Sequence, residues 1–182
     1  ATGDFDADDL PDIVSAAYGS NELSIHRNLG SLRFESVLIA NDFNELVGVC
    51  TGDFNDDGLE DIATAQKRGD NNIRWFKNGG GSSFSAVPIS ADGEANGAEA
   101  IHAADLDNDG DLDLISGAST AVHWYENDGA ADPSFTARTI TTSADGAHSV
   151  YAADIDDDGD IDVLSAGYTD QKVTWYENDG AA

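Results

Sequence analysis

The sequence predicts an all-β protein, a β-propeller built of four-stranded antiparallel blades. Four acidic windows of nine residues begin at residues 4, 53, 105 and 154, so the chain repeats itself about every 50 residues. Internal repeats of this length are typical of propellers and solenoids. Each unit also contains four short apolar or alternating runs separated by turn residues, and we find no helical periodicity. Four short strands at this period predict the blades of a propeller.

Each strand of the unit has its own pattern, which the third copy shows clearly. The first run, residues 100–102, leads into the acidic window, and the second, residues 114–117, leaves it as a small apolar stretch. The third, residues 122–125, alternates with period two, as expected of a strand that packs one face. An Asn-Asp-Gly turn follows. The fourth strand carries Phe135 and Ile140.

The repeat divides the chain into four units, residues 1–45, 46–96, 97–146 and 147–182. The first unit lacks most of its opening strand, and the fourth stops after its Asn-Asp-Gly turn. We therefore expect the sequence to be a segment of a larger propeller. We also expect the strand edge at residues 174–178 to be completed by further chain or by a neighbouring copy, because bare edges invite pairing.

Composition limits the classes of function. The 182 residues include 36 acidic and 8 basic side chains, for a formal net charge of −28. Such a field repels nucleic acid and anionic membranes. No apolar run approaches the roughly 18 residues of a membrane span. We therefore expect neither a nucleic-acid partner nor a membrane span, while 40% hydrophobic residues indicate a packed core.

The acidity is concentrated in the four windows, which hold 20 of the 28 aspartates. In the fourth window, residues 154–162, aspartates at positions 1, 3 and 5 can converge if the chain curls, and Gly159 at position 6 permits the curl. The carbonyl of position 7 and a bidentate Asp162 would bring the total to about six oxygens. This set suits Ca²⁺ better than Mg²⁺, which prefers a smaller and stricter octahedron.

An EF-hand loop begins in the same way but does not fit these windows. It needs a bidentate Glu at position 12 and a helix on each side. Position 12 is instead occupied by Ser15, Thr64, Ser116 and Ser165, and the flanking segments read as strands. We therefore interpret the windows as loops between strands.

The windows and one strand end together resemble the FG-GAP/VCBS repeat. That strand end reads W-F-K-N at residues 75–78 and W-Y-E-N at residues 124–127 and 175–178, each followed within two residues by glycine. The family includes the propeller of integrin α-subunits and many secreted microbial and algal proteins. The resemblance covers essentially the whole chain. It implies Ca²⁺ in a loop between two strands of a blade, usually within a seven-bladed ring.

Carried over position by position, the resemblance implies four Ca²⁺ ions, one per window. Positions 1, 3, 5 and 9 would bind through side chains and position 7 through its carbonyl. In window order the ligands are Asp4, Asp6, Asp8, Leu10 and Asp12; Asp53, Asn55, Asp57, Leu59 and Asp61; Asp105, Asp107, Asp109, Asp111 and Asp113; and Asp154, Asp156, Asp158, Asp160 and Asp162. We expect the first two sites to be weaker, because Asp9 replaces the glycine, Pro11 occupies position 8 and Asn55 is neutral.

No constellation breaks the repeat in the way that an active site would, so we expect no enzyme activity. The four histidines are not equivalent, and the paired carboxylates are better explained as metal ligands than as a glycosidase pair. The strand tryptophans are expected to pack between sheets, with sugar stacking as the alternative. Cys50 is expected to be a small buried filler. The loops at residues 67–70 and 168–170 are the candidate contact points.

These observations predict an extracellular or cell-surface calcium-binding module for protein recognition, adhesion or surface assembly. The location follows from the metal, since cytosolic calcium would leave such sites empty. The expected partners are a protein or glycan ligand and further blades. A carbohydrate-binding lectin and a non-catalytic accessory domain of a secreted enzyme are the alternatives. Glycan binding would favour the first alternative, and a catalytic domain elsewhere in the full-length chain would favour the second.

Overall fold

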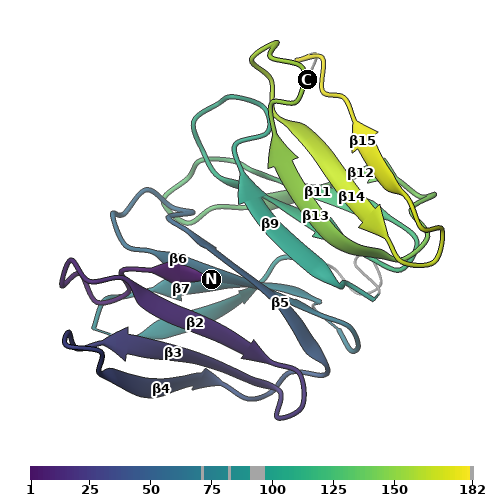
Figure 1. The fold of residues 1–182 in the computed structure, drawn as a ribbon. Helices are drawn as coiled ribbons and strands as arrows, with labels where there is room; N and C mark the ends of the chain where they lie inside the picture. The colour runs from purple at the N-terminus through teal and green to yellow at the C-terminus, as the bar shows by residue number, and fades with distance from the viewer. Residues whose placement is uncertain (71, 82, 91–96, 181–182) are drawn as a thin grey trace.

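The computed structural model describes residues 1–70, 72–81, 83–90 and 97–180. Within these residues the chain forms 15 strands and no helix, which confirms the predicted all-β class. The strands make four antiparallel sheets that follow one another along the chain, and each sheet is one blade (Figure 1). None of the described segments is a helix that could cross a bilayer.

Every blade uses strands in chain order. Blade 1 contains β1 (Thr2–Gly3), β2 (Asp12–Ala17), β3 (Glu22–Asn28) and β4 (Phe34–Ala40). Blade 2 contains β5 (Leu46–Gly52), β6 (Asp61–Gln66), β7 (Ile73–Asn78) and β8 (Phe84–Pro88). Blade 3 contains β9 (Ala100–Ala104), β10 (Asp113–Gly117), β11 (Val122–Asn127) and β12 (Phe135–Thr141). Blade 4 contains β13 (Ala147–Ala153), β14 (Asp162–Gly167) and β15 (Val173–Tyr176).

The predicted order of strands within the unit is confirmed, and the predicted burial of the second strand is complete in blades 2 and 3. The second strands β6 and β10 are buried at every position. They belong to blades 2 and 3, so one face of each strand packs in the cluster with the preceding blade and the other face in the cluster with the following blade. The fourth strands β4, β8 and β12 lie at the outer edge and are largely exposed. The Asn-Gly-Gly and Asn-Asp-Gly turns place glycine in the left-handed region, as predicted, with φ of 81° at Gly80 and 65° at Gly129.

The hydrophobic core lies between blades. Three clusters of equivalent side chains join blade 1 to blade 2, blade 2 to blade 3 and blade 3 to blade 4. Each cluster contains a third-strand residue of the earlier blade, followed by a second-strand and a third-strand residue of the later blade. The three equivalent sets, in that order, are Ile25, Ile62 and Phe76; Trp75, Leu114 and Tyr125; and Trp124, Val163 and Tyr176. Propeller blades are held to their neighbours in this way, so each blade depends on the next one for its buried surface.

The four blades form an arc that is not closed within the described residues (Figure 1). In blade 2 the side chains of Ile73 and Trp75 are 0% and 2% exposed. The equivalent Val173 and Trp175 of blade 4 are 74% and 44% exposed. The predicted packing of a repeat tryptophan between sheets is therefore confirmed for Trp75. Trp175 differs because no further blade of the described chain covers its side.

Cys50 lies on β5 inside the cluster between blades 2 and 3, and its thiol is free. Burial raises the pKa of this thiol to about 12. A thiol with so little thiolate at neutral pH is unreactive. The prediction that Cys50 is a small buried filler is confirmed.

Candidate metal centre

Each acidic window forms the loop that joins the first strand of a blade to the second. In loop 4 the carboxylate of Asp154 accepts N–H bonds from Asp158 and Gly159 at 3.2 and 3.1 Å. The Oδ1 atom of Asp158 then accepts the N–H of Asp160 at 3.0 Å. The same three bonds recur in the other loops. The loop curls because its aspartates at positions 1 and 5 satisfy its own backbone donors.

Two residues of each loop are left-handed, at positions 4 and 6. At position 6 the three glycines have φ between 84° and 102°, and Asp9 replaces them in loop 1 with φ of 66°. This value lies in the region that aspartate tolerates, so the substitution keeps the loop. Sequence reasoning missed position 4, although three of its four residues are Asn or Asp, which favour this conformation. The four position-4 residues are Ala7, Asp56, Asn108 and Asp157, and their φ angles lie between 55° and 62°.

The aspartate at position 9 begins the second strand and ties the loop to the third strand. Asp113 is fully buried; its Oδ2 accepts the N–H of Leu106 at 3.0 Å and its Oδ1 accepts that of Asn127 at 2.8 Å. The other three blades repeat both bonds. Desolvation raises the pKa of Asp61 and Asp113 to about 6, although these N–H bonds oppose the shift. In blade 2, Oδ2 of Asp61 also accepts the Nε1–H of Trp75 at 3.0 Å, whereas Oδ1 of Asp61 accepts the backbone N–H of Asn78 and has a second lone pair that could face a cation.

Asparagines at the end of the third strand bridge adjacent blades. The Asn127 side chain donates to the carbonyl of Phe54 in loop 2 at 2.9 Å and to that of Leu112 in its own loop at 3.0 Å. Asn78 bridges to Phe5, and Asn178 bridges to Leu106, in the same way. We call Asn78, Asn127 and Asn178 the bridging asparagines. The sequence placed them at the start of the turns but did not predict that they bridge blades, although their repeat within the W-Y-x-N strand end was the available signal.

Three of the four loops gather carboxylates tightly. In each of these loops, three side chains offer oxygens that all lie within 4.8 Å of one another. The three sets are Asp4, Asp6 and Asp8; Asp105, Asp107 and Asp113; and Asp154, Asp156 and Asp162. In the described residues of loop 2 no three carboxylates meet in this way, and position 3 there is the neutral Asn55.

The other predicted ligands lie in the loops but outside these sets. Asp12 belongs to loop 1, Asp109 and Asp158 to loops 3 and 4, and Asp53, Asp57 and Asp61 to loop 2. The carbonyls of the position-7 residues were predicted as ligands. The backbone N–H groups of these residues donate hydrogen bonds to the Oδ1 atom of the position-5 aspartate. The position-7 residues are Leu10, Leu59, Asp111 and Asp160. The Asp160 side chain also accepts a bond of 2.9 Å from Asn108, which connects loop 4 to loop 3.

In loops 1, 2 and 3 the position-3 side chain carries a buried oxygen with no hydrogen bond. Among the described residues, Oδ1 of Asp6, of Asn55 and of Asp107 is buried and accepts none. Burial, and next the charge of Asp8 or Asp109 respectively, raises the pKa of Asp6 and of Asp107. A buried acceptor without a donor is costly and needs an explanation. Crowded oxygens with unused lone pairs match the chemistry of a hard cation, so the residues present fit Ca²⁺.

One further position distinguishes the loops, namely the residue just before the bridging asparagine or its blade 1 equivalent. In blade 1 it is Arg27, whose Nε lies 3.3 Å from Oδ2 of Asp6. In blade 2 it is Lys77, which turns to Asp132 of blade 3. In blades 3 and 4 it is Glu126 and Glu177. Loop 1 therefore has an arginine that partly neutralises it, whereas blades 3 and 4 carry a glutamate at this position, which in blade 3 pairs with Arg138.

Comparison with known families gives the class of the protein. The family model of the FG-GAP-like repeat matches residues 4–64, 53–116 and 105–165. Each match begins at one acidic loop and ends within the strand that follows the next loop. The chain belongs to the FG-GAP-like repeat family, as the sequence predicted. A comparison with curated proteins finds no match.

Solved structures show the same propeller-like fold. One is an Agrocybe aegerita lectin that recognises non-reducing terminal N-acetylglucosamine, with 20% identity and a TM-score of 0.64 over 98% of this chain and 52% of that one. Another is BBS1N in complex with ARL6DN, with 13% identity and a TM-score of 0.58 over 98% of this chain and 56% of that one. The chain thus spans about half the length of either structure.

Proposed function

We propose that the chain is a calcium-binding propeller module that serves recognition, adhesion or assembly outside the cell and has no catalytic role. The observation that carries the metal is the unused buried oxygen at position 3 of three loops. In loop 3, Asp105, Asp107 and Asp113 would hold the ion, and in loop 4, Asp154, Asp156 and Asp162 would do so. Positions 5 and 7 would complete the oxygen set in each loop.

The ion would supply positive charge where the fold has collected negative charge. Three carboxylates within 4.8 Å repel one another, and the position-9 member of loops 3 and 4 is fully buried. Ca²⁺ would relieve this repulsion and fix the loop against the second strand. Four ions would change the formal charge from −28 to about −20. Carboxylate loops of this kind and the remaining negative charge would suit a calcium-rich extracellular medium.

The proposed recognition surface lies at the blade end opposite to the acidic loops, where the second and third strands are joined. Residues 67–70 and 168–170 occupy equivalent hairpins there. The Tyr168 side chain is 77% exposed. A polar hollow of about 290 Å³ beside the first hairpin is lined by residues that include Gly69 and Arg74. Loops held by a rigid scaffold are common contact sites.

Calcium titration by calorimetry tests the metal proposal. We expect Asp107→Ala to remove one binding event, because it deletes the position-3 ligand of loop 3. The matched control is Asp70→Ala, which removes the same charge from the exposed hairpin outside the loops and should keep every event. Absence of binding to the unmodified chain, or equal isotherms for the two variants, would overturn the proposal.

A glycan ligand is the second candidate. Two observations favour it: the likeness to a lectin that binds a terminal sugar, and the 44% exposed ring of Trp175. Exposed aromatic rings offer apolar faces on which a sugar can stack. Titration with N-acetylglucosamine should then shift the indole resonance of Trp175, and Trp175→Ala should abolish binding. A chain that binds no sugar leaves a protein ligand as the proposed partner.

A further inference from the structure

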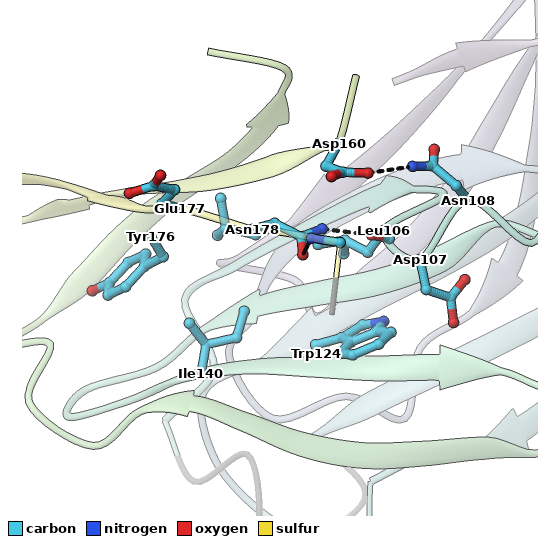
Figure 2. A pocket seen from close by; sticks show the side chains of 11 residues that line it. Leu106, Asp107, Asn108, Trp124, Ile140, Asp160, Tyr176, Glu177 and Asn178 are labelled. Carbon is cyan, nitrogen blue, oxygen red and sulfur yellow. Dashed lines mark hydrogen bonds between the residues drawn. The ribbon is translucent and has the colours of Figure 1, made fainter. Parts of the chain in front are cut away.

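Loops 3 and 4 are joined by a side-chain hydrogen bond that crosses from one blade to the next. The Nδ2 atom of Asn108 donates to Oδ1 of Asp160 at 2.9 Å and to the carbonyl oxygen of Gly159 at 3.4 Å (Figure 2). Asn108 occupies position 4 of loop 3, between the proposed ligands at positions 3 and 5. Asp160 occupies position 7 of loop 4, whose carbonyl is a proposed ligand. The bond therefore connects the ligand-bearing part of one loop to that of the next.

The bridging asparagine Asn178 makes a second connection between the same loops. Its side chain donates to the carbonyl of Leu106 at 2.8 Å (Figure 2). Leu106 is position 2 of loop 3 and carries no proposed ligand. The other two bridging asparagines make the equivalent bond between blades 1 and 2 and between blades 2 and 3. The asparagine bridge is thus common to the three blade pairs, whereas the bond from Asn108 belongs to loops 3 and 4.

The two equivalent positions carry other side chains in the earlier loop pairs. Between loops 1 and 2 they are Ala7 and Leu59, which offer no side-chain hydrogen bond. Between loops 2 and 3 they are Asp56 and Asp111. Desolvation, followed by the charges of Asp109 and Asp56, raises the pKa of Asp111. Two acidic groups therefore oppose each other there. Within the described loops, a donor faces an acceptor at these positions only between loops 3 and 4.

We propose that Asn108 makes calcium binding at loops 3 and 4 positively cooperative. The inference rests on the proposed calcium function and adds its regulation. Without metal, the crowded carboxylates of each loop repel one another and favour an opened loop, which cannot hold its end of the bond. An ion in loop 3 fixes positions 3 and 5 and so fixes Asn108, which holds Asp160 where its carbonyl can bind the second ion. Each ion thus favours the arrangement that the other needs, which is the requirement for positive coupling.

Calcium titration of the full chain, followed by amide NMR, measures the coupling. The position-6 glycines Gly110 and Gly159 report the two loops separately, because each N–H donates to the first aspartate of its own loop. Asp107→Ala disables loop 3, and we expect loop 4 to bind calcium at least about fivefold more weakly in this variant, the lower end of the usual range. Asp156→Ala disables loop 4 and should weaken loop 3 by the same factor, because coupling between binding sites is reciprocal.

Asn108→Ala tests the bond itself. Alanine should keep the shape of the loop, since Ala7 occupies the same position of loop 1 with the same φ of 59°. In this background both factors should fall to about twofold or less, because only the bridge from Asn178 remains. The matched control is Asp157→Ala, which makes the same backbone change at the exposed position 4 of loop 4. It should leave the coupling factor as in the natural chain.

The outcomes separate this inference from the proposed function. If both glycines respond to calcium but loop 4 has the same affinity in the natural chain and in Asp107→Ala, the coupling is overturned and the calcium function stands. Coupling that survives Asn108→Ala would overturn the role of the bond. Unequal factors from the two reciprocal variants would indicate damage to the fold in place of coupling and would also overturn the inference. No response of either glycine would overturn the proposed function and the inference together.

Discussion

The side chain of Asn127 donates a hydrogen bond of 2.9 Å to the backbone carbonyl of Phe54, which lies 73 residues earlier in the chain. The bond joins the third strand of blade 3 to the acidic loop of blade 2. The backbone N–H of the same asparagine donates to Asp113, the last residue of the loop in its own blade. One residue thus connects two candidate metal loops, and the geometry of each loop depends on the seating of the next blade.

We predict that Asn127→Ala lowers the free energy of unfolding by about 2–4 kcal/mol. The change leaves two carbonyls, those of Phe54 and Leu112, without their donor, and each buried unsatisfied group costs about 1–3 kcal/mol. Urea unfolding followed by tryptophan fluorescence measures the effect. Asn41→Ala, at an exposed position before blade 2, is the control and should change stability by less than about 0.5 kcal/mol. Equal losses in the two variants would contradict the bridging role.

The loops should differ in calcium affinity, with loops 3 and 4 the tighter. In loop 1, Arg27 already pairs with Asp6 and competes with a cation. We therefore predict that Arg27→Gln tightens calcium binding at loop 1 by roughly twofold to fivefold, the range of a partly exposed ion pair. Calorimetric titration resolves the site. Arg33→Gln, which removes an exposed arginine before β4, should leave the isotherm unchanged, and an unchanged isotherm for Arg27→Gln would contradict the competition.

His102 should make stability depend on pH. It is half-buried on β9 beside the ring of Tyr151, and desolvation lowers its pKa below the usual 6.5. The unfolded chain therefore takes up a proton at a higher pH than the folded chain does. The stability contributed by neutral His102 is present above about pH 6.5 and is lost as the pH falls below it.

A comparison with His102→Gln isolates this effect from the titration of the many carboxylates. Unfolding free energies measured by urea between pH 8 and pH 5 should fall further for the natural chain than for the variant. The difference between the two should therefore shrink or reverse as the pH decreases. Parallel curves for the two proteins would show that His102 keeps its usual pKa.

Cys50 is a built-in probe of blade separation. Its thiol is buried between blades 2 and 3, and burial raises its pKa to about 12. We predict that a thiol reagent reacts with it only when these blades open, so saturating calcium should slow the reaction at least tenfold relative to excess chelator. Denatured protein gives the reference rate. A rapid reaction that calcium does not affect would contradict both the packing and its link to the metal.

Much of this architecture follows from the sequence because the repeat reports the same environment several times. The order of strands, the turn glycines and the burial of Cys50 were each predicted from aligned positions. The bridging asparagines were not, because an asparagine at a strand end has many possible partners and the partner here is a backbone carbonyl of another blade. The pairing of Arg27 with Asp6 was missed for a similar reason, since it depends on how β3 meets loop 1 in space.

The packing of the fourth-strand phenylalanines between blades also could not be predicted from the sequence. The pattern showed that Phe34, Phe84 and Phe135 align, but not that the ring of one blade fills the space behind the loop of the preceding one. Conversely, the composition of the loops indicated a cation, and the structure contributes the unused oxygens of Asp6, Asn55 and Asp107. Which oxygens converge depends on the φ angles at positions 4 and 6 together, and only position 6 was evident as glycine.

The most direct test of the central claim, that calcium in the acidic loops stabilises the blades, is calorimetric melting of the same sample in excess chelator and in excess calcium. Each site filled at a hundred times its Kd adds about 2.7 kcal/mol, which is roughly 5–10 °C for a chain of this size. We predict a rise of at least 10 °C in calcium, corresponding to loops 3 and 4, and full reversal by chelator. Superimposable melting curves would contradict the claim, because the carboxylates would then be held together without a metal.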